Sequence, residues 1–167
     1  MTLRKNAFCS YCGQKFFVDQ SWPRTCGNCQ QITYLNPLPV AIALLPVDGG
    51  LLCVRRGIEP AVGELALPGG FMDLGETWEE SAARELWEEA CIRIDPKELE
   101  LFRVFSSRSQ PYLLIFGRAR ERAASALPPF VANDEASERT IVRQPVELAF
   151  PLHTRAMRDY FASRNGE

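Results

Sequence analysis

The 167-residue chain has a formal net charge of −2 and no run of basic residues long enough to follow a phosphate backbone, which disfavours a dedicated nucleic-acid-binding protein. Hydrophobic residues make up 46% of the chain, enough for the core of one domain with a small appendage. No signal-peptide core and no stretch of about 18 apolar residues is present, and we therefore expect a soluble, cytoplasmic protein that does not enter a membrane.

Two Cys-x-x-Cys pairs lie near the N-terminus, with residues 13–25 between them, a spacing typical of a four-thiolate zinc ribbon. Each pair has a glycine after or between its thiols, where a tight metal-binding loop needs a positive φ. A redox-active pair is the alternative, but neither pair opens a thioredoxin-like helix. We predict a zinc ribbon at residues 1–35, in which Zn²⁺ has a closed shell of sulfurs and a structural role. Its ligands are Cys9, Cys12, Cys26 and Cys29.

Residues 36–167 are predicted to form a second, α/β domain. The linker Asn-Pro-Leu-Pro leads into an apolar run at 40–47, which has the length of a strand buried on both faces. A following Asp-Gly-Gly turn favours a hairpin with a strand at 51–56. The later elements expected are a glycine-rich loop at 64–77, strands at 99–107 and 111–120, a loop at 121–138, a short strand at 139–143 and an amphipathic helix at 152–164.

A helix is also expected from Thr77 to Ala90, because Thr77 and Glu80 have the spacing of a capping box. Three glutamates share one arc of this helix. The residues expected to face the core are Ala83, Leu86, Trp87 and Ala90.

Those glutamates are Glu85, Glu88 and Glu89. Like charges at such spacings destabilise a helix by about 0.2–0.5 kcal/mol per pair, and the negative C-terminal end of the helix dipole adds to the repulsion. Helix stability therefore does not explain the cluster. One interpretation is a solvated acidic face softened by Arg84; the other is a site for Mg²⁺ or Mn²⁺, which prefer oxygen ligands.

The surrounding sequence favours the metal site. From Gly70 the chain reads glycine, five residues, Glu76, seven residues, and then Arg-Glu-Leu-Trp-Glu-Glu at 84–89, with Leu-Pro-Gly-Gly at the start. This pattern resembles the Nudix box, Gx5Ex7REUxEExGU with U aliphatic, at every charged position. The element order is similar to that of Nudix hydrolases over residues 38–165, and residues 67–92 carry the specific motif. The resemblance implies a Nudix-type α/β/α sandwich with a mixed sheet.

The resemblance also implies roles for the acidic residues. Nudix hydrolases use divalent metals and water to attack a phosphorus atom of a nucleoside diphosphate linked to a second group. Arg84 would then orient the carboxylates, and Glu88 or Glu89 would accept a proton from water. Some relatives supply a further acid from a downstream loop, for which Glu135 and Glu138 are the candidates here. The implied ligands of Mg²⁺ or Mn²⁺ are Glu76, Glu85, Glu88, Glu89 and, from the loop, Glu135.

A zinc ribbon before a Nudix domain resembles the NADH pyrophosphatases and the related enzymes that cleave ADP-ribose or FAD. The segment at 109–117, SQPYLLIFG, begins like the SQPWPFPxS array of the NADH enzymes and then diverges, which favours ADP-ribose or FAD with release of AMP. NADH, nucleotide-capped RNA and a non-catalytic nucleotide sensor are the alternatives, and the intact box disfavours the sensor. The expected partner is a small-molecule nucleotide, on which Tyr34 or Tyr112 could stack, and the sequence permits a homodimer.

Cys91 stands where the Nudix box has a glycine, at the end of the helix. A glycine there adopts a left-handed conformation, which would strain a cysteine by about 1–2 kcal/mol. The chain either accepts this strain or ends the helix in another way. Of the remaining reactive side chains, Cys53 is expected to be a small buried hydrophobe and His153 a surface or packing residue.

Overall fold

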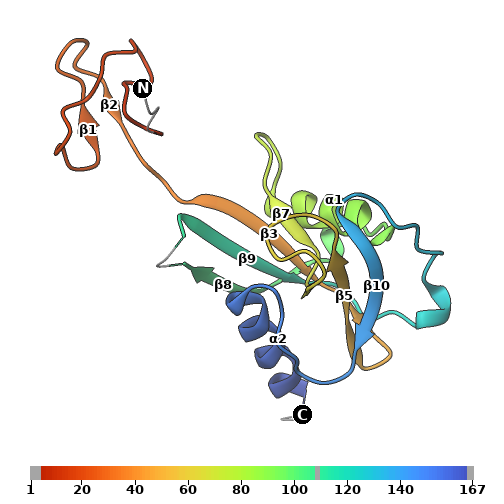
Figure 1. Ribbon diagram of the computed structural model, residues 1–167. Coiled ribbons are helices and arrows are strands. Elements are labelled where there is room, and N and C mark those ends of the chain that lie inside the picture. Colours follow the sequence, from red (N-terminus) through yellow and green to blue (C-terminus); the bar gives the residue numbers. More distant parts are fainter. Residues whose placement is uncertain (1–4, 108–109, 165–167) are drawn as a thin grey trace. The chain divides into compact units, whose positions relative to one another are not determined.

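Residues 5–107 and 110–164 are described by a computed structural model, in which the chain divides into two units, Met1–Pro37 and Leu38–Glu167 (Figure 1). Ser109, with which the SQPYLLIFG segment begins, lies outside the described residues. No helix in the described part of the chain is both long enough and apolar enough to cross a bilayer.

The N-terminal unit has a small core built around cysteines. Phe16 and Cys26 are buried, and Trp22 packs edge-on against Phe16 with ring centroids 6.1 Å apart. Two short strands, β1 (Arg24–Thr25) and β2 (Ile32–Thr33), form an antiparallel pair. So few buried side chains do not stabilise a unit of this size without a further cross-link.

Two sheets form the centre of the larger unit, and one of them is mixed because β3 and β9 run parallel. In the mixed sheet the order is β7 (Gly69–Phe71), β3 (Leu38–Leu44), β9 (Tyr112–Arg118) and β8 (Glu100–Ser106). In the other sheet the order is β10 (Ala136–Val142), β5 (Gly50–Arg56) and β4 (Pro46–Val47), and β6 (Leu65–Ala66) also pairs with β5.

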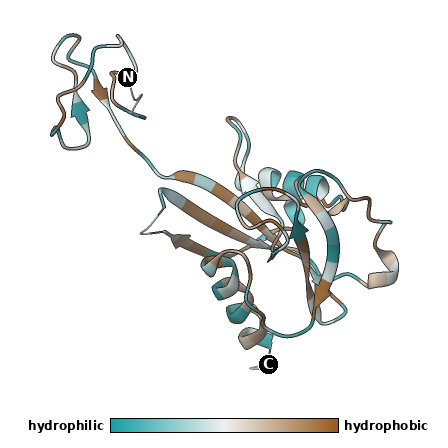
Figure 2. Ribbon diagram, viewed as in Figure 1, coloured by the Kyte–Doolittle hydropathy of each residue, from teal (hydrophilic) through white to brown (hydrophobic). Residues whose placement is uncertain are grey.

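The strands lie between α1 (Trp78–Ala90) and α2 (Pro151–Arg164), as Figure 1 shows. In β3, Ala41 and Ala43 belong to the core cluster shared with α1, whereas Ile42 between them belongs to the cluster shared with α2. Both faces of β3 are therefore buried, and hydrophobic residues dominate β3 and β9 (Figure 2). The predicted α/β/α sandwich with a mixed sheet is confirmed.

The predicted hairpin of residues 40–47 with 51–56 is confirmed beside its turn, where Pro46 and Val47 pair with Leu51 and Gly50, but it is wrong for residues 40–44. β3 begins at Leu38, inside the predicted linker, and pairs with β7 and β9, while only the short β4 pairs with β5. The chain changes sheets just before Pro46, which has no N–H to continue the β3 ladder. An apolar run indicates burial but carries no information about the pairing partner.

Other boundaries also differ from the prediction. The glycine-rich loop contains β6 and β7, and β10 begins at Ala136 rather than at Arg139. The segments around β8 and β9 include two 3₁₀ turns, η1 (Pro96–Glu98) and η2 (Ala124–Ala126).

The start of α1 follows the sequence pattern. The Glu80 amide donates to Thr77 Oγ1 at 3.2 Å and the Thr77 amide donates to the Glu80 carboxylate at 2.8 Å, which confirms the capping box. The core assignment of Trp87 is wrong, because this side chain is 41% exposed and stacks under the Arg93 guanidinium, 3.9 Å from its ring centroid. The acidic side of α1 is not a wholly solvated face, since Glu85 and Glu89 are buried.

Candidate active site

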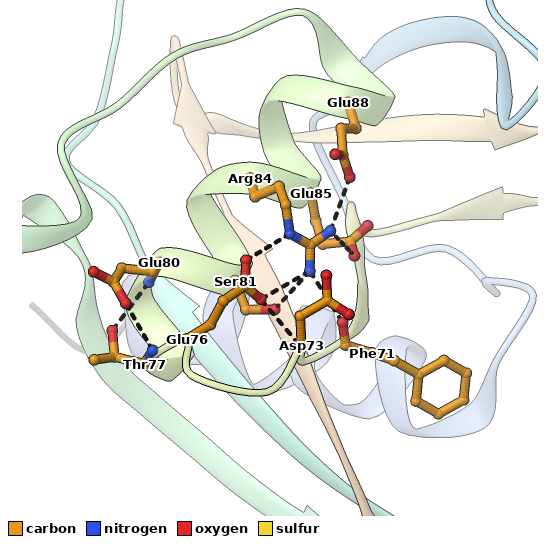
Figure 3. Close-up of polar contacts among 9 residues, drawn as sticks. All are labelled: Phe71, Asp73, Glu76, Thr77, Glu80, Ser81, Arg84, Glu85 and Glu88. Carbon is orange, nitrogen blue, oxygen red and sulfur yellow. Dashed lines mark hydrogen bonds and ion pairs between the residues drawn. The ribbon is translucent and has the colours of Figure 1, made fainter.

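One guanidinium contacts three acidic side chains beside α1 (Figure 3). Arg84 donates through Nε and Nη2 to both oxygens of Glu76, at 2.8 and 3.0 Å, and so fixes the loop before α1. Its Nη1 donates to Glu85 at 2.7 Å and to Glu88 at 2.8 Å, and Nη2 also donates to the Phe71 carbonyl at 3.0 Å. The donors of Arg84 are therefore committed to the protein's own groups.

A second group of carboxylates joins α1 to the turn before β10. Oxygens of Glu85, Glu89 and Glu135 lie within 4.8 Å of one another. Glu85 and Glu89 are only 7% and 6% exposed, whereas Glu135 is exposed. The Gly69 amide donates to Glu89 at 3.0 Å, and Glu89 has no ion pair within residues 5–107 and 110–164. Buried acids this close together repel unless a proton or a cation neutralises them.

The environment separates the acids into two electrostatic classes. Burial raises the pKa of Glu85, and burial with the nearby charges of Glu85 and Glu135 raises the pKa of Glu89 to about 8. Hydrogen bonds from Arg84, in contrast, lower the pKa of Glu76 to about 2. Glu76 is thus stabilised as an anion by its arginine, whereas Glu89 is left to hold a proton or a positive ion.

Two glycines let β7 approach these acids. A Cβ on Gly70 would overlap the carboxylate of Glu85, and a Cβ on Gly69 would lie 2.7 Å from the Ile42 Cα. Close backbone packing therefore requires glycine at 69, whereas a side chain at 70 would displace the Glu85 carboxylate. The same approach brings the Gly69 amide within hydrogen-bonding distance of Glu89.

The acids line one part of a cavity of about 890 Å³, and aromatic and aliphatic side chains line much of the remainder. The Phe71 and Tyr112 rings form an edge-on pair in its wall, with centroids 5.4 Å apart. Arg56 also lines the cavity, with its guanidinium 5.0 Å from the Phe150 ring centroid. Cavities of this size and mixed lining are typical of sites for small organic ligands.

The structure divides the acids that the sequence proposed together. Glu88 and Glu76 contact Arg84 and lie outside the group of three carboxylates, and Glu88 has a 46% exposed side chain. Of the two loop candidates, Glu135 joins that group, whereas Glu138 pairs with Arg55 at 2.6 Å. Helical periodicity groups residues by angle, but it does not tell which of them an arginine will hold.

Arg56 and His153 also line the cavity, and sequence reasoning did not place either of them at a site. Arg56 gave no signal beyond its place at the end of a strand. His153 was expected at the surface or in packing; it is buried, with its ring 5.6 Å from Phe116 and 5.0 Å from Phe150, and it also lines the cavity. Of the two candidate stacking residues, Tyr112 lines the cavity, whereas Tyr34 lies in the N-terminal unit and is 64% exposed.

The four paired cysteines meet in the N-terminal unit. Their sulfurs lie within 4.8 Å of one another, with Cys9 and Cys29 at 3.7 Å and Cys12 and Cys26 at 3.6 Å. Sulfurs about 2.3 Å from a tetrahedral Zn²⁺ are roughly 3.8 Å apart, so the group fits zinc, whereas disulfide sulfurs are about 2 Å apart.

The predicted backbone requirement at the two cysteine pairs is only half right. Gly13 has the expected positive φ of 74°, but Gly27 does not, and in the second pair Gln30 takes the left-handed conformation at 59°. The requirement falls on the residue directly after each pair, and in the second pair that residue is not a glycine.

Cys91 accepts the backbone conformation of the glycine it replaces. Its φ and ψ are 59° and 27°, in the left-handed region, and its amide donates to the carbonyls of Leu86 and Trp87. Its thiol lies 3.6 Å from the Val131 carbonyl and outside the carboxylate group.

The fold and site can be compared with known proteins. The chain is 31% identical over 140 residues to an ADP-ribose pyrophosphatase of Methanocaldococcus jannaschii, covering 80% of this chain and 78% of that one. It is 34% identical over 92 residues to the NAD-capped RNA hydrolase NudC of Edwardsiella ictaluri, 54% of this chain but only 35% of that protein, so it spans about a third of this relative.

The chain is also similar to solved structures and matches the model of a protein family. A crystal structure of a NUDIX hydrolase from Nitrosomonas europaea superposes with a TM-score of 0.73 and 26% identity, covering 95% of this chain and 92% of that one. The model of the NUDIX domain matches residues 36–158, which contain all five acids of the two groups described above. The chain therefore belongs to the NUDIX family.

Proposed function

We propose that this chain is a metal-dependent pyrophosphohydrolase that cleaves the diphosphate of an ADP-linked nucleotide and releases AMP. The observation that carries the proposal is the group of Glu85, Glu89 and Glu135 at the wall of the cavity. Three carboxylates form a hard, oxygen-only donor set, which suits Mg²⁺ or Mn²⁺ with substrate phosphates completing the shell. Glu89 supports this assignment because its burial disfavours a free negative charge.

The protein's own residues divide the work in this proposal. Glu85, Glu89 and Glu135 hold the cation, and Arg84 keeps Glu76, Glu85 and Glu88 in place. When bound, the cation lowers the pKa of water and stabilises negative charge on the phosphates. Glu88 or Glu89 accepts the proton as the water oxygen bonds to phosphorus and the bridging P–O bond breaks.

ADP-ribose or a similar ADP-linked compound is the substrate that we favour. Besides the acids, the cavity has an apolar and aromatic lining, in which Phe71, Tyr112 and Phe150 could contact a base or a second ring. The Methanocaldococcus relative, named for ADP-ribose, supports this choice because the similarity covers most of both chains. NAD-capped RNA is the second candidate, since the Edwardsiella relative is named for it.

The N-terminal unit is proposed to be a zinc ribbon with a structural role, comprising residues 1–35 and preceding a Nudix domain at 36–167. Four thiolates close the tetrahedral shell, so no open position is left for a substrate or for water. Zinc binding supplies the cross-link that the small core of this unit requires.

The test is a product assay with the full chain and Mg²⁺ or Mn²⁺. ADP-ribose, FAD, NADH and NAD-capped RNA are incubated separately, and AMP or monophosphate-ended RNA is measured by chromatography. AMP from ADP-ribose or FAD, abolished by EDTA, is the expected result. Hydrolysis of capped RNA alone would assign the second candidate, and hydrolysis of none of the four would reject the pyrophosphohydrolase.

A further inference from the structure

The turn that carries Glu135 is tied to the end of α1 by one side-chain amide. Asn133 Nδ2 donates to the Glu88 carbonyl at 2.7 Å. Its Oδ1 accepts from the backbone amides of Glu135 at 2.9 Å and of Ala136 at 2.8 Å. The donor and the acceptor of one amide thus join the helix that bears two carboxylates of the group to the turn that bears the third.

This connection matters because the other bonds of this turn do not reach α1: the Gly57 amide donates to the Glu135 carbonyl at 2.7 Å, and the Asn133 amide donates to the Ala136 carbonyl at 3.0 Å. The Glu135 side chain is exposed, and residues 127–133 before it have no regular secondary structure. Glu85 and Glu89, in contrast, are fixed by a buried helix face. Cations such as Mg²⁺ demand closely defined ligand positions, so a third carboxylate on a loose turn would contribute little binding free energy.

We infer that Asn133 is a positioning residue for the cation site, acting through Glu135 by fixing its turn against the last turn of α1. The inference rests on the proposed function only in taking the group of Glu85, Glu89 and Glu135 as a cation site. If Asn133 acts only through Glu135, substituting Asn133 has no further effect on cation binding once Glu135 has been removed as a ligand. That dependence separates positioning from a general contribution to stability.

Arg139 provides a matched control on the same two segments. Its Nη1 donates to the Ala90 carbonyl at 2.8 Å and its Nη2 to the Pro128 carbonyl at 2.7 Å. Arg139 therefore also joins α1 to the segment before β10, but these two bonds reach neither Glu135 nor Ala136. Loss of Arg139 loosens the segment without releasing the turn of Glu135.

The experiment measures Mn²⁺ binding to the metal-free acidic site of the full, zinc-loaded chain by electron paramagnetic resonance, without substrate. The variants are Asn133→Ala, Glu135→Gln, the double variant, and Arg139→Met. Asn133→Ala is expected to weaken Mn²⁺ binding about tenfold, as loss of an outer contact of a metal site typically does. In the Glu135→Gln background the same change is expected to have no further effect, and Arg139→Met alone should change the dissociation constant less than twofold.

Three results would overturn the inference. The first is unchanged Mn²⁺ binding in Asn133→Ala, and the second is that Asn133→Ala weakens binding as much in the Glu135→Gln background as in the wild type. The third is that Arg139→Met weakens binding as much as Asn133→Ala does. If Asn133→Ala does not fold, Asn133→Ser takes its place in the same cycle, because serine can accept one amide bond of the turn but cannot reach Glu88. Wild-type Mn²⁺ binding without hydrolysis of any nucleotide would reject the proposed function and leave this inference standing.

Discussion

The Gly69 amide and the Glu89 carboxylate are joined by a hydrogen bond of 3.0 Å, and among the residues that the structure describes no other group donates to this acid, which is 6% exposed. One neutral donor compensates only part of the desolvation of a carboxylate. In the metal-free protein an ionised Glu89 therefore destabilises the fold, and the same desolvation raises the pKa of Glu89.

Glu89→Gln should consequently have opposite effects on stability and activity. Without metal, the variant should melt at a higher temperature than the wild type near pH 8, because a neutral amide replaces a buried charge. AMP release should fall by orders of magnitude, because a metal ligand or proton acceptor is lost. Calorimetry in EDTA and the product assay measure the two effects, and a variant that is both less stable and fully active would contradict this reading of Glu89.

Glu135, before β10, and Glu138, within β10, form a matched pair of acids for a second test. Glu135→Gln should lower activity strongly at limiting Mn²⁺, because Glu135 belongs to the carboxylate group. Glu138→Gln should leave activity near wild type and stability within about 1 kcal/mol, because its ion pair with Arg55 is solvent-exposed. Activation curves against Mn²⁺ concentration compare the two, and a larger effect at Glu138 would reverse the assignment.

His153 should make the protein sensitive to mild acid. Its burial lowers its pKa to about 3, whereas an unfolded histidine titrates near 6.5, so the unfolded chain binds the proton more readily between these values. Stability from the neutral ring is complete above about pH 6.5 and declines as the pH falls toward 3. His153→Gln should flatten this decline in urea unfolding at pH 7.5 and pH 5, and parallel pH profiles for the two proteins would refute the prediction.

Cys91→Gly should relieve strain without affecting catalysis. The left-handed φ of 59° favours glycine in the folded state, whereas the greater freedom of glycine in the unfolded chain opposes folding. We expect the free energy of unfolding to rise by about 0.5–1 kcal/mol. Chemical denaturation measures the gain, and the product assay should give wild-type turnover. A folded variant that had lost most of its turnover would show that the thiol has a function.

Cys26→Ser should remove zinc from the N-terminal unit and unfold it. Metal analysis of the wild type is expected to give about one zinc per chain, and the folding of a small unit such as Met1–Pro37 depends on the bound metal. Cys91→Ser serves as the control that keeps its zinc, because Cys91 lies outside the four-cysteine group. Full zinc content in Cys26→Ser would reject the proposed ligand set.

The elements predicted best were those with a local cause. The capping box of Thr77 and Glu80 depends on neighbouring residues alone and is confirmed. At Cys91 the sequence left two ways of ending the helix open, and the structure shows the left-handed one. The partners of β3 could not be predicted, because an apolar run pairs equally well with any strand that buries it. Trp87 was wrongly assigned to the core because it lies at the edge of the apolar face of α1, where an angle of about 100° per residue does not separate buried from exposed positions.

The candidate site was predicted in its residue types but not in its arrangement. The box spacing pointed to Arg84 and to the acids at 76–89, but not to Glu135, which was only a candidate from a downstream loop. The separation of Glu88 from Glu89 depends on tertiary contacts: Glu88 contacts the Arg84 guanidinium, and Glu89 accepts from the Gly69 amide. Asn133 had no signal in the sequence, because its partners are backbone groups and any residue could have supplied them.

The C-terminus of α1 has a consequence for the order in which the chain can fold during synthesis. Its last turn contains no basic residue, and the carbonyls of Glu88 and Ala90 are bonded by Asn133 and Arg139, far downstream. A helix of 13 residues is marginal in water on its own. While the ribosome has released only the Nudix box, these bonds cannot form and the third carboxylate does not yet exist. The cation site therefore assembles late, and a chain stopped before residue 133 should bind Mn²⁺ weakly even though it already contains the whole motif.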